Sequence, residues 1–426
     1  MSEGVDTVGL DTPPRLEVDA LLDDPGTRII VCCGSGGVGK TTTAAALGVR
    51  AAGRGRKVVV LTIDPARRLA QSMGIDSLDN TPREVAGAGV AGGGRLHAMM
   101  LDMKRTFDEI VEAHADGERA RAILANPFYQ SLSAGFAGTQ EYMAMEKLGQ
   151  LSARDDWDLI IVDTPPSRSA LDFLDAPKRL GSFLDGKFIR VLMAPAKVGG
   201  RAGMKFLNVG MSMMTGTLSK LMGASLLGDV QTFVAAMDTM FGGFRTRADA
   251  TFRLLQAPGT AFLVVASPEP DALREAAYFV ERLAAEKMPL AGLVLNRVHA
   301  SGADQLSAER ALAAAENLEE GGIVDQESGK AGERGAAEEA VPTPGPGSPS
   351  AEGGTAEVDR ITAGLLRLHA ERMQVIAREQ RTRDRFTSLH PEVAVAEVAA
   401  LPGDVHDLAG LRAIGERLAA GVPAGA

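Results

Sequence analysis

The sequence predicts an α/β protein with a doubly wound, mostly parallel sheet. Short, almost uninterrupted apolar runs alternate along the chain with longer helical stretches, and they lie at 28–33, 57–63, 96–101, 159–162, 261–266, 291–295 and 393–398. Strands that are apolar on both sides are typical of a parallel sheet with helices on both faces. A glycine-rich stretch also follows the first run, at the strand-to-helix turn where such folds bind phosphate.

Composition narrows the class of protein. The 426 residues, 45% of them hydrophobic, suffice for one large domain or two ordinary ones. A formal net charge of −10 argues against nucleic acid or anionic lipid as a general partner, because both favour positive surface. The two cysteines, Cys32 and Cys33, are adjacent. They cannot form a disulfide framework or a spaced thiolate site, and we expect two small buried hydrophobes.

The chain divides into a core and three other segments. We expect a flexible tail over 1–26, which is acidic and lacks the apolar centre of a secretory signal. The core covers 27–175 and 256–420. Within it, 319–357 has few branched hydrophobes and is expected to be a disordered insertion. Because no run of 18 uncharged apolar residues occurs, we expect a cytoplasmic protein, and peripheral membrane association stays open.

A methionine-rich helical subdomain is expected over 176–255. The strand signal stops there, and eight of the chain's 17 methionines fall within it: Met193, Met204, Met211, Met213, Met214, Met222, Met237 and Met240. Methionine fills irregular gaps in cores and also lines adaptable binding grooves. The composition alone leaves an ordinary helical core and a hydrophobic groove as alternatives.

The clearest motif follows the first apolar run. GSGGVGKT fits the phosphate-loop pattern G-x-x-x-x-G-K-[ST], with a strand pattern before it and a helix pattern after it. Glycines let main-chain N–H groups close around phosphate oxygens, the lysine reaches the β and γ phosphates, and the following hydroxyl binds magnesium. The motif predicts a site for ATP and Mg²⁺ formed by Gly34, Ser35, Gly36, Gly37, Val38, Gly39, Lys40, Thr41 and Thr42.

Two acidic residues follow later strands. Asp163 ends the run DLIIVD, and Asp64 comes directly after KVVVLTI. Since the carboxyl ends of parallel strands meet at one sheet edge, both acids are expected near the phosphate loop. We expect Asp163 to hold magnesium together with Thr41. By itself, Asp64 followed by proline is as compatible with an ordinary turn as with a functional role.

Taken in order, these segments resemble the ArsA and guided-entry targeting-factor ATPases, a branch of the deviant Walker A class that also contains MinD and ParA. The resemblance runs nearly end to end. LTIDPARRLA resembles switch I, which implies that Asp64 positions the attacking water, with Lys40 as the other catalytic residue. IIVDTPPSRSALDFLDAP resembles switch II, which implies that it relays the nucleotide state to the helical part.

The same resemblance extends to the nucleotide base. VVASPEPDALREAAYFVERL resembles the family's V-x-x-P-E stretch, and LVLNRV places Asn296 where the family reads adenine. AEVAALPGDVHDLAGL resembles the late loop, which implies that Pro402, Gly403 and Asp404, up to Val405, pack on the base. The family also uses the region after switch II to hold hydrophobic clients, and this favours a groove for the methionine-rich segment.

Two departures from the family pattern limit what carries over. The family's phosphate loop has a lysine, reaching across a nucleotide-sandwich dimer, where this chain has Ser35. We therefore expect slow hydrolysis as a homodimer or a heterodimer with an ArsA-like paralogue that supplies the cation. Arg168 is a candidate substitute within the chain, and a solvated surface arginine is the alternative. The chain also lacks C-x-x-C, so we expect no zinc or arsenite site.

The sequence thus predicts an ATP hydrolase that couples dimer closure to a hydrophobic client or a membrane partner. One alternative is a positioning ATPase of the MinD or ParA kind. The C-terminal run LAGLRAIGERLAAGVPAGA opposes it, because it has only two cations and its apolar residues are spaced for packing. A second alternative, the regulatory half of a heteromeric ATPase, is favoured by Ser35 and opposed by the retained Lys40, Thr41, Asp64 and Asp163.

Overall fold

The computed structural model describes most of the chain outside the methionine-rich segment. The described residues are 13–64, 68–89, 92–127, 129, 130, 133, 139–165, 246–328 and 351–420. Side chains are described in these ranges except at 321–328 and 351–355. Arg168, the methionine-rich stretch up to residue 245 and the central part of the expected insertion, 329–350, lie outside these ranges.

An eight-stranded sheet forms the centre of the protein, with the order β3-β4-β2-β5-β1-β6-β7-β8. All neighbouring pairs are parallel except β3 with β4. This confirms the predicted doubly wound, mostly parallel α/β fold, and each of the seven predicted runs overlaps a strand. The strands are β1 (Ile29–Cys33), β2 (Lys57–Thr62), β3 (Arg83–Glu84), β4 (Arg95–Met100), β5 (Leu159–Asp163), β6 (Thr260–Ala266), β7 (Leu290–Val298) and β8 (Val395–Ala399).

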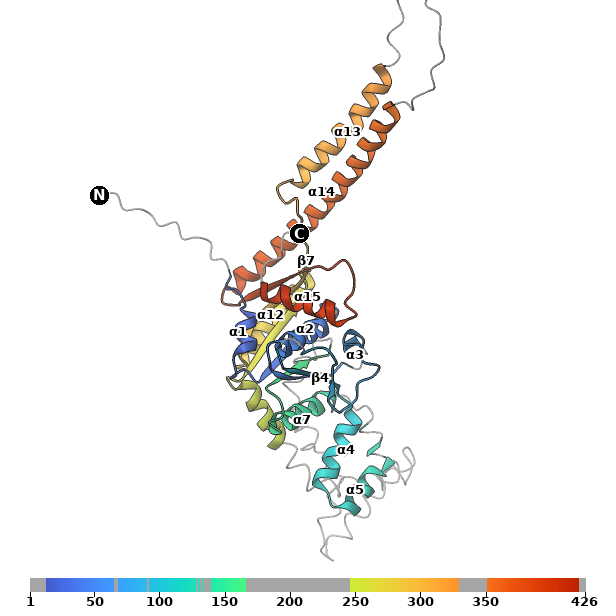
Figure 1. The fold of residues 1–426 in the computed structure, drawn as a ribbon. Coiled ribbons are helices and arrows are strands. Elements are labelled where there is room, and N and C mark those ends of the chain that lie inside the picture. Colours follow the sequence, from blue (N-terminus) through green and yellow to red (C-terminus); the bar gives the residue numbers. More distant parts are fainter. Residues whose placement is uncertain are drawn as a thin grey trace, which may run out of the picture.

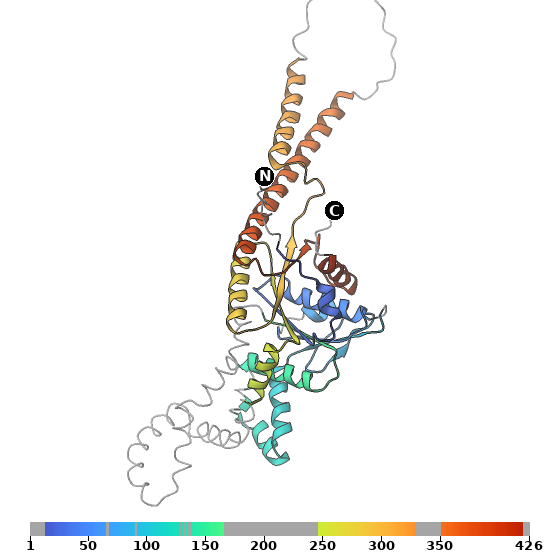
Figure 2. The same ribbon diagram turned by 90° about the vertical axis from the view of Figure 1, so that its left-hand side faces the viewer.

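Helices cover both faces of this sheet (Figures 1 and 2). The described helices are α1 (Val18–Asp23), α2 (Lys40–Gly53), α3 (Arg68–Ser72), α4 (Met103–His114), α5 (Gly117–Leu124), α7 (Thr139–Ala153), α12 (Pro270–Ala285), α13 (Ala308–Ser328), α14 (Ala351–Leu389) and α15 (Leu408–Ala420). Helices α2 and α15 pack on one face, and α7 and α12 pack on the other. The strands are therefore apolar on both sides, as their sequences indicate.

The central strand β1 contributes to two separate cores. Ile29, Val31 and Cys33 belong to the core on the α7 and α12 side, whereas Ile30 and Cys32 belong to the core on the α2 side. Successive side chains of a strand alternate between faces, which explains this division. Both thiols are buried. The two cysteines therefore pack as small hydrophobic residues on opposite faces of the sheet.

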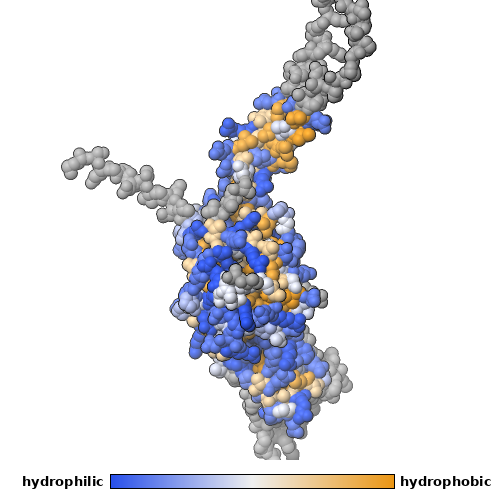
Figure 3. All heavy atoms as spheres, in the orientation of Figure 1, coloured by the Kyte–Doolittle hydropathy of each residue, from blue (hydrophilic) through white to orange (hydrophobic). Residues whose placement is uncertain are grey.

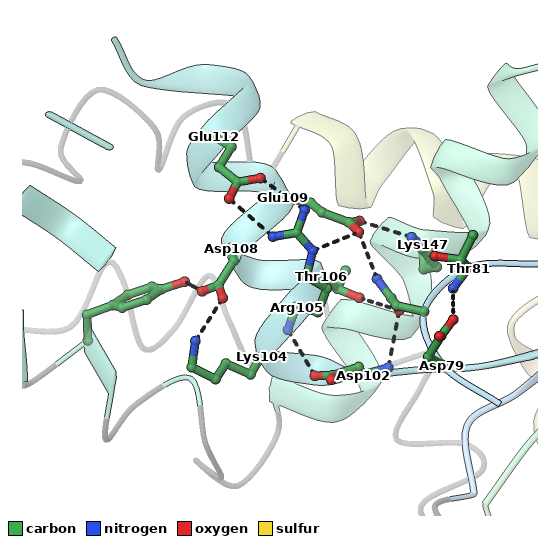
Figure 4. A network of polar contacts seen from close by, with 12 residues as sticks. Asp79, Thr81, Asp102, Lys104, Arg105, Thr106, Asp108, Glu109, Glu112 and Lys147 are labelled. Carbon is green, nitrogen blue, oxygen red and sulfur yellow. Dashed lines mark hydrogen bonds and ion pairs between the residues drawn. The ribbon is translucent and has the colours of Figure 1, made fainter. Parts of the chain in front are cut away.

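Helices α4 and α5 extend beyond the sheet and are anchored by a polar network (Figure 4). The Asn80 side chain accepts hydrogen bonds from Asp102 N and Thr106 Oγ1 at 3.1 Å, and it donates to Glu109 at 3.1 Å. Glu109 also pairs with the buried Lys147 of α7 at 3.0 Å. Buried polar groups must be paired to avoid a desolvation cost, so this network fixes α4 against α7.

A helical hairpin of α13 and α14 projects from the other end of the molecule (Figures 1 and 2). The helical sequence pattern at 361–381 lies within the longer α14. The segment 319–357, expected to be disordered, is helical at both of its ends, because α13 continues to Ser328 and α14 begins at Ala351. Two antiparallel helices support each other's extension even where the composition is poor in branched hydrophobes. Within the described part of the chain, no helix has the length and apolar character needed to cross a membrane.

Candidate nucleotide site

The loop between β1 and α2 has a backbone that requires glycine. Gly34 has φ +150°, and a Cβ placed on it would lie 2.1 Å from the carbonyl oxygen of Val265 in the neighbouring strand β6. Gly37 and Gly39 also have positive φ, at +80° and +96°. Only glycine adopts such angles without strain. The loop can therefore curve closely enough for its N–H groups, and those of the first turn of α2, to surround an anion.

Lys40 lies over this loop. Its ammonium donates a hydrogen bond to the Ser35 carbonyl oxygen at 2.7 Å, and the residue is only 5% exposed. Desolvation lowers its pKa, while the negative charges of Asp163 and Asp64 oppose that shift. The amino group of Lys40 thus lies at the phosphate loop, where the oxygens of a triphosphate could replace the carbonyl as its acceptor.

Asp163 lies at the centre of the site and is fully buried. Its Oδ2 accepts hydrogen bonds from Thr41 Oγ1 and Thr62 Oγ1, both at 2.8 Å. Its Oδ1 is buried without a hydrogen-bond partner. Burial raises the pKa of Asp163 to about 6, although the two threonine hydroxyls oppose the shift. A buried carboxylate oxygen with no donor needs a ligand to offset its desolvation.

These groups fit a magnesium ion. Mg²⁺ prefers oxygen ligands, keeps several waters and is commonly held by one or two carboxylates together with substrate phosphates. The unpartnered Oδ1 of Asp163 and the Thr41 hydroxyl supply such oxygens at the phosphate loop. No cluster of three or more His, Cys, Asp or Glu side chains suited to a metal occurs among the described residues. The ion would therefore depend on phosphate and water oxygens for its remaining ligands.

Asp64 lies at the same sheet edge. It follows β2 by two residues and is half-buried, and its backbone N–H donates to Thr62 Oγ1 at 3.2 Å. The segment is also held from α7, where Gln140 Nε2 donates to the Ile63 carbonyl at 2.9 Å. The charge of Asp64 acts on both Lys40 and Asp163. The structure thus brings the three residues into one electrostatic site.

Thr62 was not predicted as a site residue. In the sheet it lies directly beside Asp163, because β2 and β5 are parallel neighbours in that register. Threonine is common in strands, so its sequence position carries no signal by itself. Aligning the carboxyl ends of the strands DLIIVD and KVVVLT would have indicated it.

Asn296, predicted to contact adenine, lies against the phosphate loop in this structure. Its Nδ2 donates a hydrogen bond to the Val38 carbonyl at 2.8 Å. A Cβ on Gly39 would lie 2.2 Å from that same nitrogen, so a larger residue would displace the Asn296 amide, and the positive φ independently favours glycine. Asn296 therefore braces the loop from the end of β7, and contact with the base stays a prediction.

The loop after β8 contains the other residues predicted to contact the base. Pro402, Gly403 and Asp404 are exposed, whereas the flanking Leu401 and Val405 pack against the core on the α2 side. All central strands are parallel, so this loop leaves the sheet at the edge that carries the phosphate loop. Its position is compatible with a role in base binding, which stays a prediction.

A depression beside the phosphate loop was not anticipated from the sequence. Its volume is about 400 Å³. It is lined by Ser35 to Val38, by Arg297, whose φ is +64°, and by three acidic residues at the N-terminal end of α12: Glu269, Asp271 and Glu275. Its lining carries these three carboxylates and one guanidinium, that of Arg297, so the formal charge of the depression is negative. The signal is visible afterwards in the run PEPDALRE, which places the acids at the start of one helix.

The fold and this site define a P-loop nucleotide-binding protein. The family model of the anion-transporting ATPases, the ArsA family, matches residues 27–320, which is more than half of the chain. The chain therefore belongs to the anion-transporting ATPase family, and the resemblance noted in its motifs is confirmed over these residues.

Individual relatives match shorter parts. The ATPase GET3 of Malassezia globosa is 32% identical over 174 residues, which cover 41% of this chain and 49% of that protein. The ATPase GET3 of Podospora anserina is 24% identical over 283 residues, covering 66% and 76%. The ATPase BagA of Mycobacterium tuberculosis is 28% identical over 171 residues, covering 38% and 49%. The chain thus spans about half the length of two of these relatives and about three quarters of the third.

Proposed function

We propose that this chain hydrolyses ATP at the site between the phosphate loop and the ends of β2 and β5. The observation that carries the proposal is the buried Oδ1 of Asp163, which has no hydrogen-bond partner and lies beside a phosphate loop with its lysine in place. A purely structural aspartate would be expected to have both oxygens satisfied.

Each residue of the site has a separate role in the proposed hydrolysis. Main-chain N–H groups of the loop bind the phosphates, and Lys40 neutralises charge that develops on the transferred phosphoryl group. Asp64 orients the attacking water toward the γ-phosphate, and Asp163 and Thr41 hold the ion. A bound Mg²⁺ would supply charge neutralisation between the β and γ phosphates. Asn296 keeps the loop closed over the phosphates from the side of β7.

Ser35 and its acidic surroundings suggest how the site is completed. The family resemblance places a lysine at this position, and here a hydroxyl stands beside Glu269, Asp271 and Glu275. An acidic depression favours an approaching cation. We propose that the active assembly is a dimer in which a paralogous chain contributes that cation, and that its closure drives handling of a hydrophobic client or a membrane partner.

A regulatory half of a heteromeric ATPase is the second candidate, and Ser35 is the observation that favours it. A MinD-like positioning ATPase is disfavoured, because α15 buries Leu411, Ile414 and Leu418 against the core and has no apolar face left for a membrane. Cation supply from Arg168 lies outside the described residues and stays a hypothesis.

The test separates binding from hydrolysis. Calorimetry should detect ATP binding that strengthens with Mg²⁺, and Asp64→Asn should retain this binding while phosphate release falls by about 10² to 10³. Asp76→Asn, an exposed aspartate away from the site, is the matched control and should keep both. Adding an ArsA-like paralogue should raise turnover of the wild-type chain. If no nucleotide binds, the proposal fails, whereas binding with no turnover in any pairing would support the regulatory candidate.

A further inference from the structure

Helix α14 carries two different apolar surfaces. The side that faces α13 is built from small residues: Ala363 and Ala370 are fully buried, as are Ala311 and Ala315 of α13. The other side carries a stripe of large hydrophobic residues in solvent, which we call the outer stripe. It consists of Val358 (61% exposed), Ile361 (57%), Leu365 (62%), Leu368 (64%) and Val375 (36%). Contiguous exposed hydrophobic residues of this size are typical of an interaction surface.

The spacing of the outer stripe indicates that it packs against another helix. Its residues recur at intervals of three, four, three and seven, which is the a and d pattern of a heptad repeat. Arg372 occupies the position that the pattern skips. Its guanidinium donates a hydrogen bond to the Ala300 carbonyl at 2.8 Å, and its apolar stem can still cover hydrophobic neighbours. Such a seam buries its side chains against another helix. Among the described elements α13 contacts the opposite side, and the hairpin projects away from the core (Figures 1 and 2).

Hydrophobic residues gather on the projecting hairpin in the view of Figure 3. The chain's own connection between the two helices, 329–350, offers little to cover them, because Val341 is its only branched hydrophobe and prolines recur through it. No described element covers the seam, and a second copy of α14 supplies a helix with the same repeat.

We propose that two copies of this chain associate through their outer stripes as an antiparallel α14 pair. In one antiparallel register, every residue of the outer stripe has a partner: Val358 packs against Val375 of the second copy, and Leu365 packs against Leu368. Ile361 then packs on the stem of Arg372. Two-fold symmetry repeats each layer, so the surface is self-complementary.

Charge supports this register independently of the apolar layers. The pairing places Glu357 of one copy beside Arg378 of the other, and symmetry produces this contact twice. Both residues are exposed, and neither takes part in the ion pairs found among the described side chains. A parallel pair in register would instead place Arg378 beside Arg383 of the second copy. Opposite charges therefore favour the antiparallel arrangement.

The geometry separates this contact from the nucleotide site. At 1.5 Å per residue, antiparallel pairing centred between Leu365 and Leu368 places the two copies of Phe386, where α14 joins the core, roughly 60 Å apart along the axis. The two cores then lie at opposite ends of the pair. Each phosphate loop remains accessible to a different partner, so this association requires no ATP.

Cysteine crosslinking of the full-length chain without nucleotide tests the register. Val358→Cys and Val375→Cys proteins should each give no disulfide dimer alone, and a mixture of the two should give one. The wild-type chain is the control, because its thiols are buried. If either variant crosslinks by itself while the mixture adds nothing, the helices are parallel and the proposal is wrong.

Sedimentation across a range of concentrations tests the surface. The wild-type chain should dimerise, and Leu365→Gln with Leu368→Gln should weaken dimerisation by about 10²-fold or more, since four leucines leave the interface. Glu357→Arg should weaken it by roughly three- to tenfold, and adding Arg378→Glu should restore it. Circular dichroism checks that the variants stay folded. A wild-type chain that is monomeric throughout, or dimerisation indifferent to both leucines, overturns the proposal.

Discussion

The carboxyl edge of the sheet and the outer stripe of α14 bury opposite kinds of groups. At the sheet edge, a carboxylate and an ammonium, those of Asp163 and Lys40, are held almost entirely out of water. On α14, leucines such as Leu365 and Leu368 are more than 60% exposed. Each arrangement is unfavourable in an isolated monomer. Both therefore indicate a missing partner, which is an ionic ligand in one region and an apolar surface in the other.

Removing the cation at the sheet edge should have the largest effect. Lys40→Ala should lower ATP turnover by about 10³-fold, because a positioned charge on the transferred phosphoryl group is lost. Phosphate release and calorimetry measure the effect. Lys104→Ala, on the exposed surface of α4, is the matched control and should behave like the wild type. Equal activity in the two variants would remove the catalytic role of Lys40.

The next largest effect concerns the loop backbone. Gly34→Ala should destabilise the fold by roughly 3 kcal/mol, because its Cβ would overlap the Val265 carbonyl and φ is +150°. Urea unfolding of the ligand-free chain gives the value. Gly53→Ala, at the end of α2 with no atom within 4 Å of the added Cβ, should instead gain up to about 1 kcal/mol. If Gly34→Ala were tolerated as well as Gly53→Ala, the described loop geometry would be contradicted.

Asp163 should make the stability of the ligand-free chain depend on pH. Its pKa is raised from 3.8 to about 6 in the folded state, so the unfolded chain releases its proton first. The free energy of unfolding should therefore fall as pH rises between about 4 and 6, by roughly 3 kcal/mol in total relative to Asp163→Asn, and stay level above that.

Unfolding curves of the wild-type chain and Asp163→Asn across pH 4 to 8 isolate this contribution. Excess Mg²⁺ should reduce the decline, because a nearby divalent cation lowers the pKa of the carboxyl group. A constant difference between the two proteins would show that burial does not perturb Asp163.

The smallest effect should come from α14. Leu365→Gln with Leu368→Gln should change the free energy of unfolding of the monomer by no more than about 0.5 kcal/mol per residue, because both side chains are largely in solvent. Chemical denaturation at a concentration below the dimerisation range measures it. A loss of several kcal/mol would mean that the stripe is covered within the monomer.

The same two regions differ in how well the sequence predicts them. Lys40, Thr41, Asp64 and Asp163 all lie together as predicted, since strand ends and a glycine motif determine their positions locally. Thr62 and the acids beside Ser35 were missed, because they depend on which strands and helices become neighbours. Asn296 contacts the loop through a hydrogen bond that no local pattern encodes.

The hairpin of α13 and α14 is predicted less well from the sequence. Composition predicted disorder up to residue 357, although α14 begins at Ala351, because composition does not reveal that a second helix runs alongside. The heptad spacing was present in the sequence, but the large side chains could have faced α13. Only the fold shows that alanines of α14 form the side that faces α13. The family model ends at residue 320, so α14 lies beyond the part of the chain that this model matches.

One hydroxyl group links the Asp163 carboxylate to the backbone of Asp64. Thr62 Oγ1 donates to Asp163 Oδ2 and accepts from the backbone N–H of Asp64. A change in what Asp163 binds therefore reaches the residue proposed to orient water through two hydrogen bonds and no intervening loop. Because the ion also depends on phosphate oxygens, its arrival would signal a bound nucleotide to the Asp64 segment through this one hydroxyl.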